Sequence, residues 1–167
     1  MRTLSIRQAR RFLLLKNGLI GGYRFRGKQG ALDYVRQAGC VQYDAVDLCR
    51  RSADLTLLSR VKGYRKQDLQ SLLYEDRALI DYFDKQLSIL SAQDWPCFAR
   101  ERQFWQEHQT RAGEQVEQAA ERVLREIEVR GPLSSRDLDL QERADWYWSE
   151  TRLSRAVLET LYFRGKL

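Results

Sequence analysis

The sequence is poor in the residues that most metal, disulfide and nucleophile sites require. Its 167 residues include one histidine, three cysteines, two prolines and one methionine. A Ser-His-Asp triad would depend entirely on His108, and no serine lies in a nucleophile-elbow motif. The three cysteines, at 40, 49 and 97, lack the even number of a disulfide framework and the paired spacing of a zinc ribbon. We therefore expect no metal and no cofactor, and we expect the cysteines to be small core residues.

Long hydrophobic runs are also missing. The longest apolar block is Phe12-Leu13-Leu14-Leu15, whereas a membrane span needs about 18 residues or more. Lys16-Asn17-Gly18 follows this block where a secretory signal would have a small-residue cleavage site. With 43% hydrophobic and 31% charged residues, the composition predicts a folded domain without a membrane partner and with a cytoplasmic location.

Positive charge is abundant and lies towards one end. The formal net charge is +6, but residues 1–66 hold 15 Lys or Arg against 4 Asp or Glu, and residues 67–167 hold 14 against 19. Of the 29 basic residues 23 are arginine, whose planar fork grips phosphate oxygens in pairs. This distribution favours nucleic acid as the partner, and the alternative is a solvated basic surface without a ligand.

The residue patterns predict a mainly α protein with small β-ribbons, an α+β fold. Ser5 with Gln8 is typical of a capping box and predicts a helix over 6–17. Further helices are expected from about 31 to Gly39 and over 51–61 and 66–77, with strands at 40–46 and within 78–90. This order is typical of a winged-helix domain, which we place at 1–92.

The remainder predicts a linking helix and a second module. A helix rich in aromatic residues is expected over 93–108, within a linking segment at 93–112. Residues 113–167 predict an amphipathic helix at 114–130, a short helix at 134–138 and a third at 149–163. Together they indicate tandem winged-helix or helix-turn-helix modules, of which the second is incomplete and ends before its wing.

A glycine-rich basic loop precedes the second predicted helix. Gly22, Gly27 and Lys28 fit the start of a phosphate-binding P-loop, but Gln29 stands where Ser or Thr should hold magnesium. The basic and aromatic residues of the loop instead suit contact with a nucleic-acid backbone, or they form a solvated loop.

Asp44 is one of only four acidic residues in the basic segment 1–66. In a strand, Gln42 and Asp44 point to the same face, which places an amide and a carboxylate side by side. Such a pair could orient water and stabilise positive charge at a sugar carbon. The alternative is a structural aspartate that caps the next helix or pairs with an arginine such as Arg50.

At this motif the sequence resembles the YcaQ-type winged-helix DNA glycosylases, which excise alkylated purines and unhook interstrand crosslinks. The chain resembles the N-terminal part of the proteins in that family. Gln42-Tyr43-Asp44 matches the catalytic Gln-x-Asp motif of the family. The other matching segments are 6–10 with Gly18-Leu19, 51–55, 58–64 with its Ser-Arg-x-x-x-Tyr signature, 81–83, 131–138, 146–148 and 158–166.

The resemblance implies a monofunctional DNA glycosylase acting on double-stranded DNA with N7-alkylated or crosslinked purines. It makes Asp44 the residue that stabilises the sugar cation or activates water, and Gln42 the residue that positions this water. Tyr43 and Tyr82 are the expected substrate-pocket residues. The expected DNA contacts are Arg24, Arg26, Lys28, Arg50, Arg51, Arg60, Lys62, Tyr64, Arg65 and Lys85.

The chain departs from the family after its Tyr-aromatic pair. Lys85 and Gln86 stand where the family has a histidine and a glutamate. Lys85 is either a wing lysine that touches phosphate or a primary amine that acts on an opened sugar. The alternative function is a non-catalytic winged-helix DNA-binding protein or transcriptional regulator, which would bind duplex DNA without releasing a base.

Overall fold

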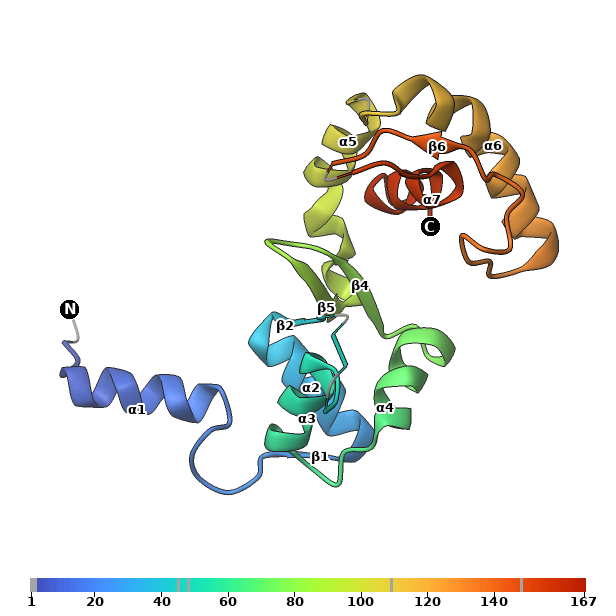
Figure 1. Cartoon of the computed structure of the whole chain (residues 1–167). Coiled ribbons are helices and arrows are strands. Elements are labelled where there is room, and N and C mark those ends of the chain that lie inside the picture. The colour runs from blue at the N-terminus through green and yellow to red at the C-terminus, as the bar shows by residue number, and fades with distance from the viewer. Residues whose placement is uncertain (1–2, 45, 48, 109, 148) are drawn as a thin grey trace. The chain divides into compact units, whose positions relative to one another are not determined.

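The computed structural model describes residues 3–44, 46–47, 49–108, 110–147 and 149–167 (Figure 1). The chain divides into two compact units, Met1–Pro96 and Cys97–Leu167. Helices dominate both units, and the sheets are small, so the predicted α+β class is confirmed. The finer division into 1–92, 93–112 and 113–167 stays a prediction.

The N-terminal unit alternates helices with short strands. Its helices are α1 (Ile6–Lys16), α2 (Gly27–Ala38), α3 (Ser52–Arg60) and α4 (Lys66–Gln70), and α4 continues into the π-helical turn η1 (Ser71–Glu75). Its strands are β1 (Phe25–Arg26), β2 (Cys40–Gln42), β3 (Val61–Lys62), β4 (Leu79–Phe83) and β5 (Leu87–Ser91).

A three-stranded antiparallel sheet organises this unit. The strand order is β2-β5-β4, so β5 is the central strand. Its Ile89 lies opposite Val41 of β2 on one side and Asp81 of β4 on the other. A separate parallel pair joins β1 to β3. The order α2, β2, α3, α4, β4, β5 agrees with the helix and strand order expected from the sequence, whereas the tandem winged-helix arrangement stays a prediction.

Helix α1 begins at the predicted capping box. The Ser5 hydroxyl accepts from the Gln8 N–H at 3.2 Å, and Gln8 Oε1 accepts from the Ser5 N–H at 2.8 Å. No residue of α1 is buried, and Phe12 and Leu13 are 59% and 57% exposed. The helix is therefore fixed by its local cap rather than by burial of its apolar face.

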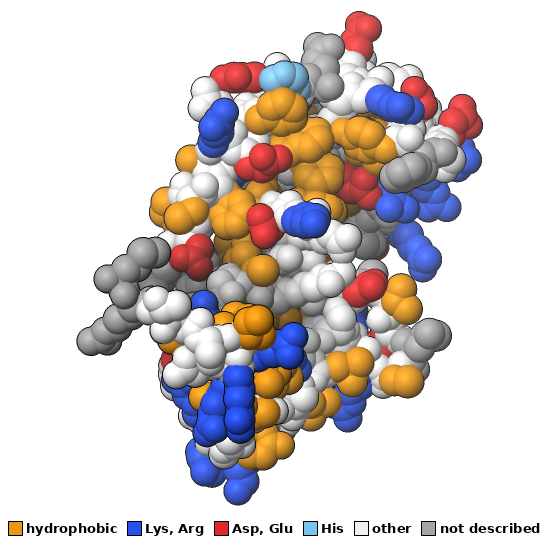
Figure 2. Space-filling model, turned by 90° about the vertical axis from the view of Figure 1, so that its left-hand side faces the viewer, with side chains coloured by type: hydrophobic (Ala, Val, Ile, Leu, Met, Phe, Trp, Pro, Cys, Tyr) orange, Lys and Arg blue, Asp and Glu red, His pale blue; other side chains and the backbone are white. Residues whose placement is uncertain are grey.

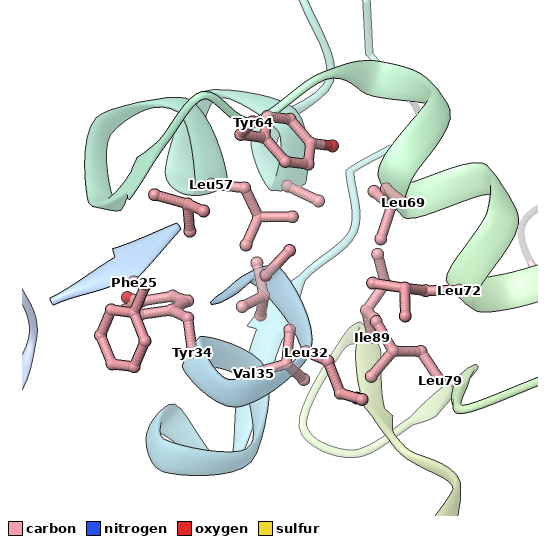
Figure 3. Packing of buried hydrophobic residues seen from close by; sticks show 14 of the residues in the cluster. Phe25, Leu32, Tyr34, Val35, Leu57, Tyr64, Leu69, Leu72, Leu79 and Ile89 are labelled. Carbon is pink, nitrogen blue, oxygen red and sulfur yellow. The ribbon is translucent and has the colours of Figure 1, made fainter. Parts of the chain in front are cut away.

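The core of the N-terminal unit lies between α2, α3, α4 and the sheet (Figure 3). Val35, Leu57 and Ile89 from α2, α3 and β5 are fully buried. Helix α2 also packs closely on the strand before it, because a Cβ on Gly30 would lie 2.7 Å from the Phe25 carbonyl carbon. Only glycine permits that approach.

The second unit contains three helices and a short ribbon among the residues that the structure describes. These elements are α5 (Ala99–Glu107), α6 (Gly113–Arg130), β6 (Arg143–Ala144), β7 (Thr151–Arg152) and α7 (Leu153–Phe163). Its own core contains Val116, Val123, Leu138 and Val157, so the amphipathic helix predicted at 114–130 is confirmed.

Several boundaries in the N-terminal unit differ from the expectation. Helix α2 begins at Gly27 instead of residue 31, and the strand expected over 40–46 ends at Gln42. The helix expected over 66–77 is α4 followed by η1. The linking helix begins as the 3₁₀ helix η2 (Ala92–Phe98), which contains Pro96, because proline lacks the N–H that a continuing α-helix needs.

The short helix predicted at 134–138 is wrong. Asp137 Oδ2 accepts from both the N–H and the hydroxyl of Ser134, at 2.7 and 2.6 Å, and this side-chain bonding closes a turn. Helix α7 begins at Leu153 rather than 149, because Thr151 and Arg152 pair with β6.

The cysteines are not core residues, contrary to the expectation. Cys40, Cys49 and Cys97 are all exposed. In β2, Val41 takes the buried position, so the neighbouring Cys40 points to the opposite face.

Replacing Leu57 with alanine tests the core of the N-terminal unit. Leu57 is fully buried, so Leu57→Ala is expected to destabilise this unit by about 2–5 kcal/mol, through lost burial and a cavity. Leu55→Ala is the matched control, because Leu55 lies on the same helix and is 48% exposed. Chemical denaturation of both variants measures the difference, and equal losses would contradict this packing.

Candidate functional site

The Gln42-Tyr43-Asp44 segment leaves the sheet at the end of β2. The Tyr43 N–H still donates to the Leu87 carbonyl at 2.9 Å, after which the chain turns away. Gln42 and Asp44 are exposed and Tyr43 is half-buried. Gln42 Nε2 donates to Gln86 Oε1 at 2.7 Å, so the β4–β5 turn orients this amide and leaves its carbonyl oxygen available.

Ser52 fixes the backbone of the segment. Its hydroxyl accepts from the Asp44 N–H at 2.9 Å and donates to the Gln42 carbonyl oxygen at 3.0 Å. Ser52 is the first residue of α3, so these two bonds tie the end of β2 to the start of that helix. Sequence reasoning missed this role, although Ser52 belongs to one of the motifs that carried the family resemblance.

The Asp44 carboxylate is only partly engaged. Its Oδ1 accepts from the Val46 N–H at 3.0 Å, which is the geometry of an Asx turn. No residue that the structure describes bonds its Oδ2 or forms an ion pair with it. Asp44 therefore neither caps α3 nor pairs with Arg50, the two structural roles that the sequence left open. Its Oδ2 is available to a ligand.

The Arg51 side chain contacts Tyr43. Its guanidinium carbon lies 5.3 Å from the centre of the Tyr43 ring, and Nη1 donates to the Tyr43 hydroxyl. Tyr74 lies close to this pair: burial, Tyr43 and Asp81 raise the pKa of Tyr74 above its ordinary value, and Arg51 opposes them. No motif in the sequence pointed to Tyr74, some 30 positions after Tyr43, as a neighbour of this segment.

Tyr64 and Tyr82 are both buried, and their roles as a DNA contact and a pocket residue stay predictions. Tyr64 is 6% exposed, and its hydroxyl donates to Asp54 Oδ1 at 2.5 Å. Tyr82 is 1% exposed and packs edge-on against Trp95, with ring centres 5.1 Å apart. The Tyr64 ring belongs to the core of the N-terminal unit, whereas the Tyr82 ring lies against Trp95 of η2.

The remaining basic residues gather in three places on the N-terminal unit. Arg26 lies opposite Lys62 in the β1–β3 pair. Two surface pockets carry the others. One is lined by Arg24 and Arg60 beside the glycine-rich loop, and the second by Arg50 and Arg65.

Figure 2 shows Lys and Arg side chains beside hydrophobic ones on the lower half of one face, where the N-terminal unit lies. This unit holds 17 Lys or Arg against 10 Asp or Glu. Its charge therefore suits a polyanion.

Two of the three expected lysine contacts, Lys28 and Lys85, differ in whether their side chains are already bonded. Lys28 Nζ lies 2.5 Å from Asp76 Oδ2 and donates to the Ser71 hydroxyl at 2.6 Å, so it ties α2 to η1. Lys85 is exposed in the turn between β4 and β5. Lys85 is therefore the freer of the two.

The described residues contain neither a metal-ligand cluster nor a membrane-spanning helix. No three His, Cys, Asp or Glu side chains in this part of the chain group to hold a metal ion. None of its helices is both long enough and apolar enough to cross a bilayer.

The class of protein comes from a comparison with known families, which points to the DNA glycosylases. The family model described as DNA glycosylase AlkZ-like matches residues 35–167. The chain belongs to this family, which confirms the resemblance seen in the sequence. No curated protein and no solved structure was found to match it.

Membership gives the protein a glycosylase-like role in DNA repair, with DNA as its partner. The match includes Gln42, Asp44 and Ser52 and begins within α2. Helix α1 and the glycine-rich loop with Arg24 and Arg26 precede it.

Removing the Tyr64 hydroxyl tests the buried pair. Tyr64→Phe leaves the Asp54 carboxylate without its buried donor, so we expect a loss of about 1–3 kcal/mol in unfolding free energy. Tyr23→Phe, at a ring that is 53% exposed, is the control.

The same variant has a pH signature. Burial, followed by the bond to Asp54, raises the pKa of Tyr64 above its ordinary 10.0. Above pH 10 the unfolded chain therefore loses a proton that the folded chain keeps, and stability falls as pH rises. The stability advantage of the wild type over Tyr64→Phe should shrink above pH 10 in denaturation series; a constant advantage would contradict the assignment.

Removing the Ser52 hydroxyl tests whether its two hydrogen bonds, to the Asp44 N–H and the Gln42 carbonyl, clamp the backbone of the segment. Ser52→Ala should speed hydrogen exchange of the Asp44 amide by about 10-fold, the equivalent of one lost hydrogen bond. Ser59→Ala is the control, because the Ser59 hydroxyl bonds only within α3. Amide exchange followed by NMR distinguishes the two, and an unchanged Asp44 amide in Ser52→Ala would refute the clamp.

Proposed function

We propose that the protein is a monofunctional DNA glycosylase that hydrolyses the N-glycosidic bond of N7-alkylated or crosslinked purines in duplex DNA. The observation that carries the proposal is the exposed pair of Gln42 and Asp44, held at the end of β2 by Ser52 in a chain of this family. The tandem winged-helix organisation and a cytoplasmic location are part of the same proposal.

Asp44 acts at the sugar. An N7-alkylated guanine already carries a positive charge, so it departs as a neutral base when the C1′–N9 bond breaks and takes the bonding electrons with it. The free Oδ2 of Asp44 faces the developing sugar cation, which a nearby carboxylate stabilises. Water then adds at C1′, and its proton passes to Asp44 or to solvent, which leaves an abasic site.

Gln42 and its neighbours position the reactants. The bond to Gln86 holds the Gln42 amide, whose carbonyl oxygen is then directed to accept from the attacking water. The reaction needs no general acid for the leaving base, which agrees with a site that contains no histidine. Arg51 holds the ring of Tyr43, the residue between Gln42 and Asp44 in the sequence.

The duplex is held by its phosphates. Arg24, Arg26 and Lys62 are exposed on the N-terminal unit, as are Arg50 and Arg65, and arginine forks bond phosphate oxygens in pairs. Lys85 contacts phosphate from its exposed turn. Tyr64 and Lys28 are not among the proposed phosphate contacts, because both side chains are bonded within the unit. Tyr64 donates to Asp54, and Lys28 bonds to Asp76 and Ser71.

Neutralising Asp44 tests the catalytic proposal. Asp44→Asn should lower the release of N7-methylguanine from duplex DNA by about 100-fold or more, with DNA affinity changed little, because the carboxylate contributes to the transition state rather than to phosphate binding. Released base and abasic sites are measured at low salt.

Asp47→Asn is the matched control, since it removes an exposed carboxylate three residues away. An Asp44→Asn variant as active as the wild type would eliminate the proposal. Salt-dependent binding by the wild type without any base release would instead support the non-catalytic DNA-binding alternative.

A further inference from the structure

The second unit carries a cluster of arginines that the proposed active site does not use. A surface pocket of about 280 Å³ lies between the turn at 134–138, the β6–β7 ribbon and the start of α7. Four arginines line it, one from the turn, one from each strand and one from α7: Arg136, Arg143, Arg152 and Arg155. Sequence analysis placed every DNA contact in the first 85 residues and missed this cluster, because residues 67–167 are acidic in total.

The fold holds these segments together from within. Ser154 is fully buried, and its hydroxyl donates to the Ser135 carbonyl at 2.8 Å, which joins the first turn of α7 to the turn before the ribbon. The N–H of Leu153 donates to the Glu142 carbonyl at 2.8 Å. The four arginines are therefore carried by backbone segments that are hydrogen-bonded to one another.

The pocket has an excess of positive charge. Arg143 pairs with Glu150 at 3.7 Å, and both side chains are more than 60% exposed. Arg155 pairs with Glu159 at 2.7 Å. The exposed Arg143–Glu150 pair contributes little stability, so a phosphate oxygen can replace the Glu150 carboxylate.

Two of the arginines have no competing anion. The side chains of Arg136 and Arg152 form neither a hydrogen bond nor an ion pair with any residue that the structure describes. The nearest acid in sequence, Asp137, is occupied by Ser134, which holds the pKa of its carboxyl below the usual range. Arg152 also stands at the N-terminus of α7, where the helix dipole favours an anion.

We propose that this pocket is a second phosphate-binding site, which takes a phosphodiester of the DNA backbone independently of the Gln42–Asp44 segment. Each guanidinium fork can bond phosphate oxygens in pairs, and the four forks come from the turn, the ribbon and α7 around one pocket. The inference rests on the proposed function only for DNA as the ligand. It assigns the second unit a direct part in holding the duplex.

The test compares salt-dependent DNA binding by the full chain and by the double variant Arg136→Ala/Arg152→Ala. Each phosphate contact contributes about 0.9 to the slope of log affinity against log salt concentration. We expect the double variant to lose about 1 to 2 from that slope, with affinity reduced about 10-fold or more at low salt. Binding to an undamaged duplex, followed by fluorescence anisotropy, supplies both values.

Arg122→Ala/Arg125→Ala is the matched control, because it removes two arginines from α6 of the same unit and neither lines the pocket. Circular dichroism verifies that both double variants fold. An affinity and slope equal to those of the wild type, or an equal loss in the control, would overturn the proposal.

Two further outcomes separate this inference from the proposed catalysis. If both double variants bind as the wild type does while Asp44→Asn abolishes base release, only the phosphate site fails. Titration with inorganic phosphate alone separates the two sources of the anion. Phosphate binding that is lost in Arg136→Ala/Arg152→Ala, with DNA binding unchanged, would show a site for free phosphate and overturn the assignment to DNA.

Discussion

The packing of α2 against α3 and the β2-β5-β4 sheet is the constraint on which the N-terminal unit depends. Val35, Leu57 and Ile89 meet there without solvent contact, and that burial supplies the main driving force for the unit. Because β2 and α3 are both anchored by this core, the short connection between them has two fixed ends. The candidate site lies on that connection, so its geometry is inherited from hydrophobic packing at a distance from the chemistry.

Hydrogen bonds then set the local geometry of the Gln42-Tyr43-Asp44 segment, whose ends the hydrophobic packing holds in place. Ser52 bonds the backbone at both ends of the Gln42-Tyr43-Asp44 segment, and Gln86 orients the Gln42 amide. The bond from the Asp44 carboxylate to the Val46 N–H closes the turn but uses only one oxygen. The segment thus has a backbone bonded at both ends and one carboxylate oxygen without a partner among the described residues, which is the arrangement that the proposed electrostatic role needs.

Charge is distributed differently in the two units. The N-terminal unit has a clear excess of basic residues, whereas the second unit is close to neutral and concentrates arginines in one pocket. A net-charge count hides such a cluster, since the acidic residues of α6 offset it although they lie on another element. Phosphate recognition depends on local rather than total charge, because exposed charges are screened within about 10 Å at ordinary ionic strength.

The sequence by itself determined the features that depend on neighbours along the chain: the α1 capping box, the long helix α6, the β4–β5 hairpin, the fold class and the Gln-x-Asp family. It could not determine features that depend on distant contacts. For example, Val41 rather than Cys40 took the buried face of β2. Only the tertiary structure decided that Tyr64 and Tyr82 would be interior, that Ser52 would hold Asp44, and that four arginines would meet. The physical reason is that burial and hydrogen-bond partners are set by which elements pack together, and a local pattern does not encode that packing.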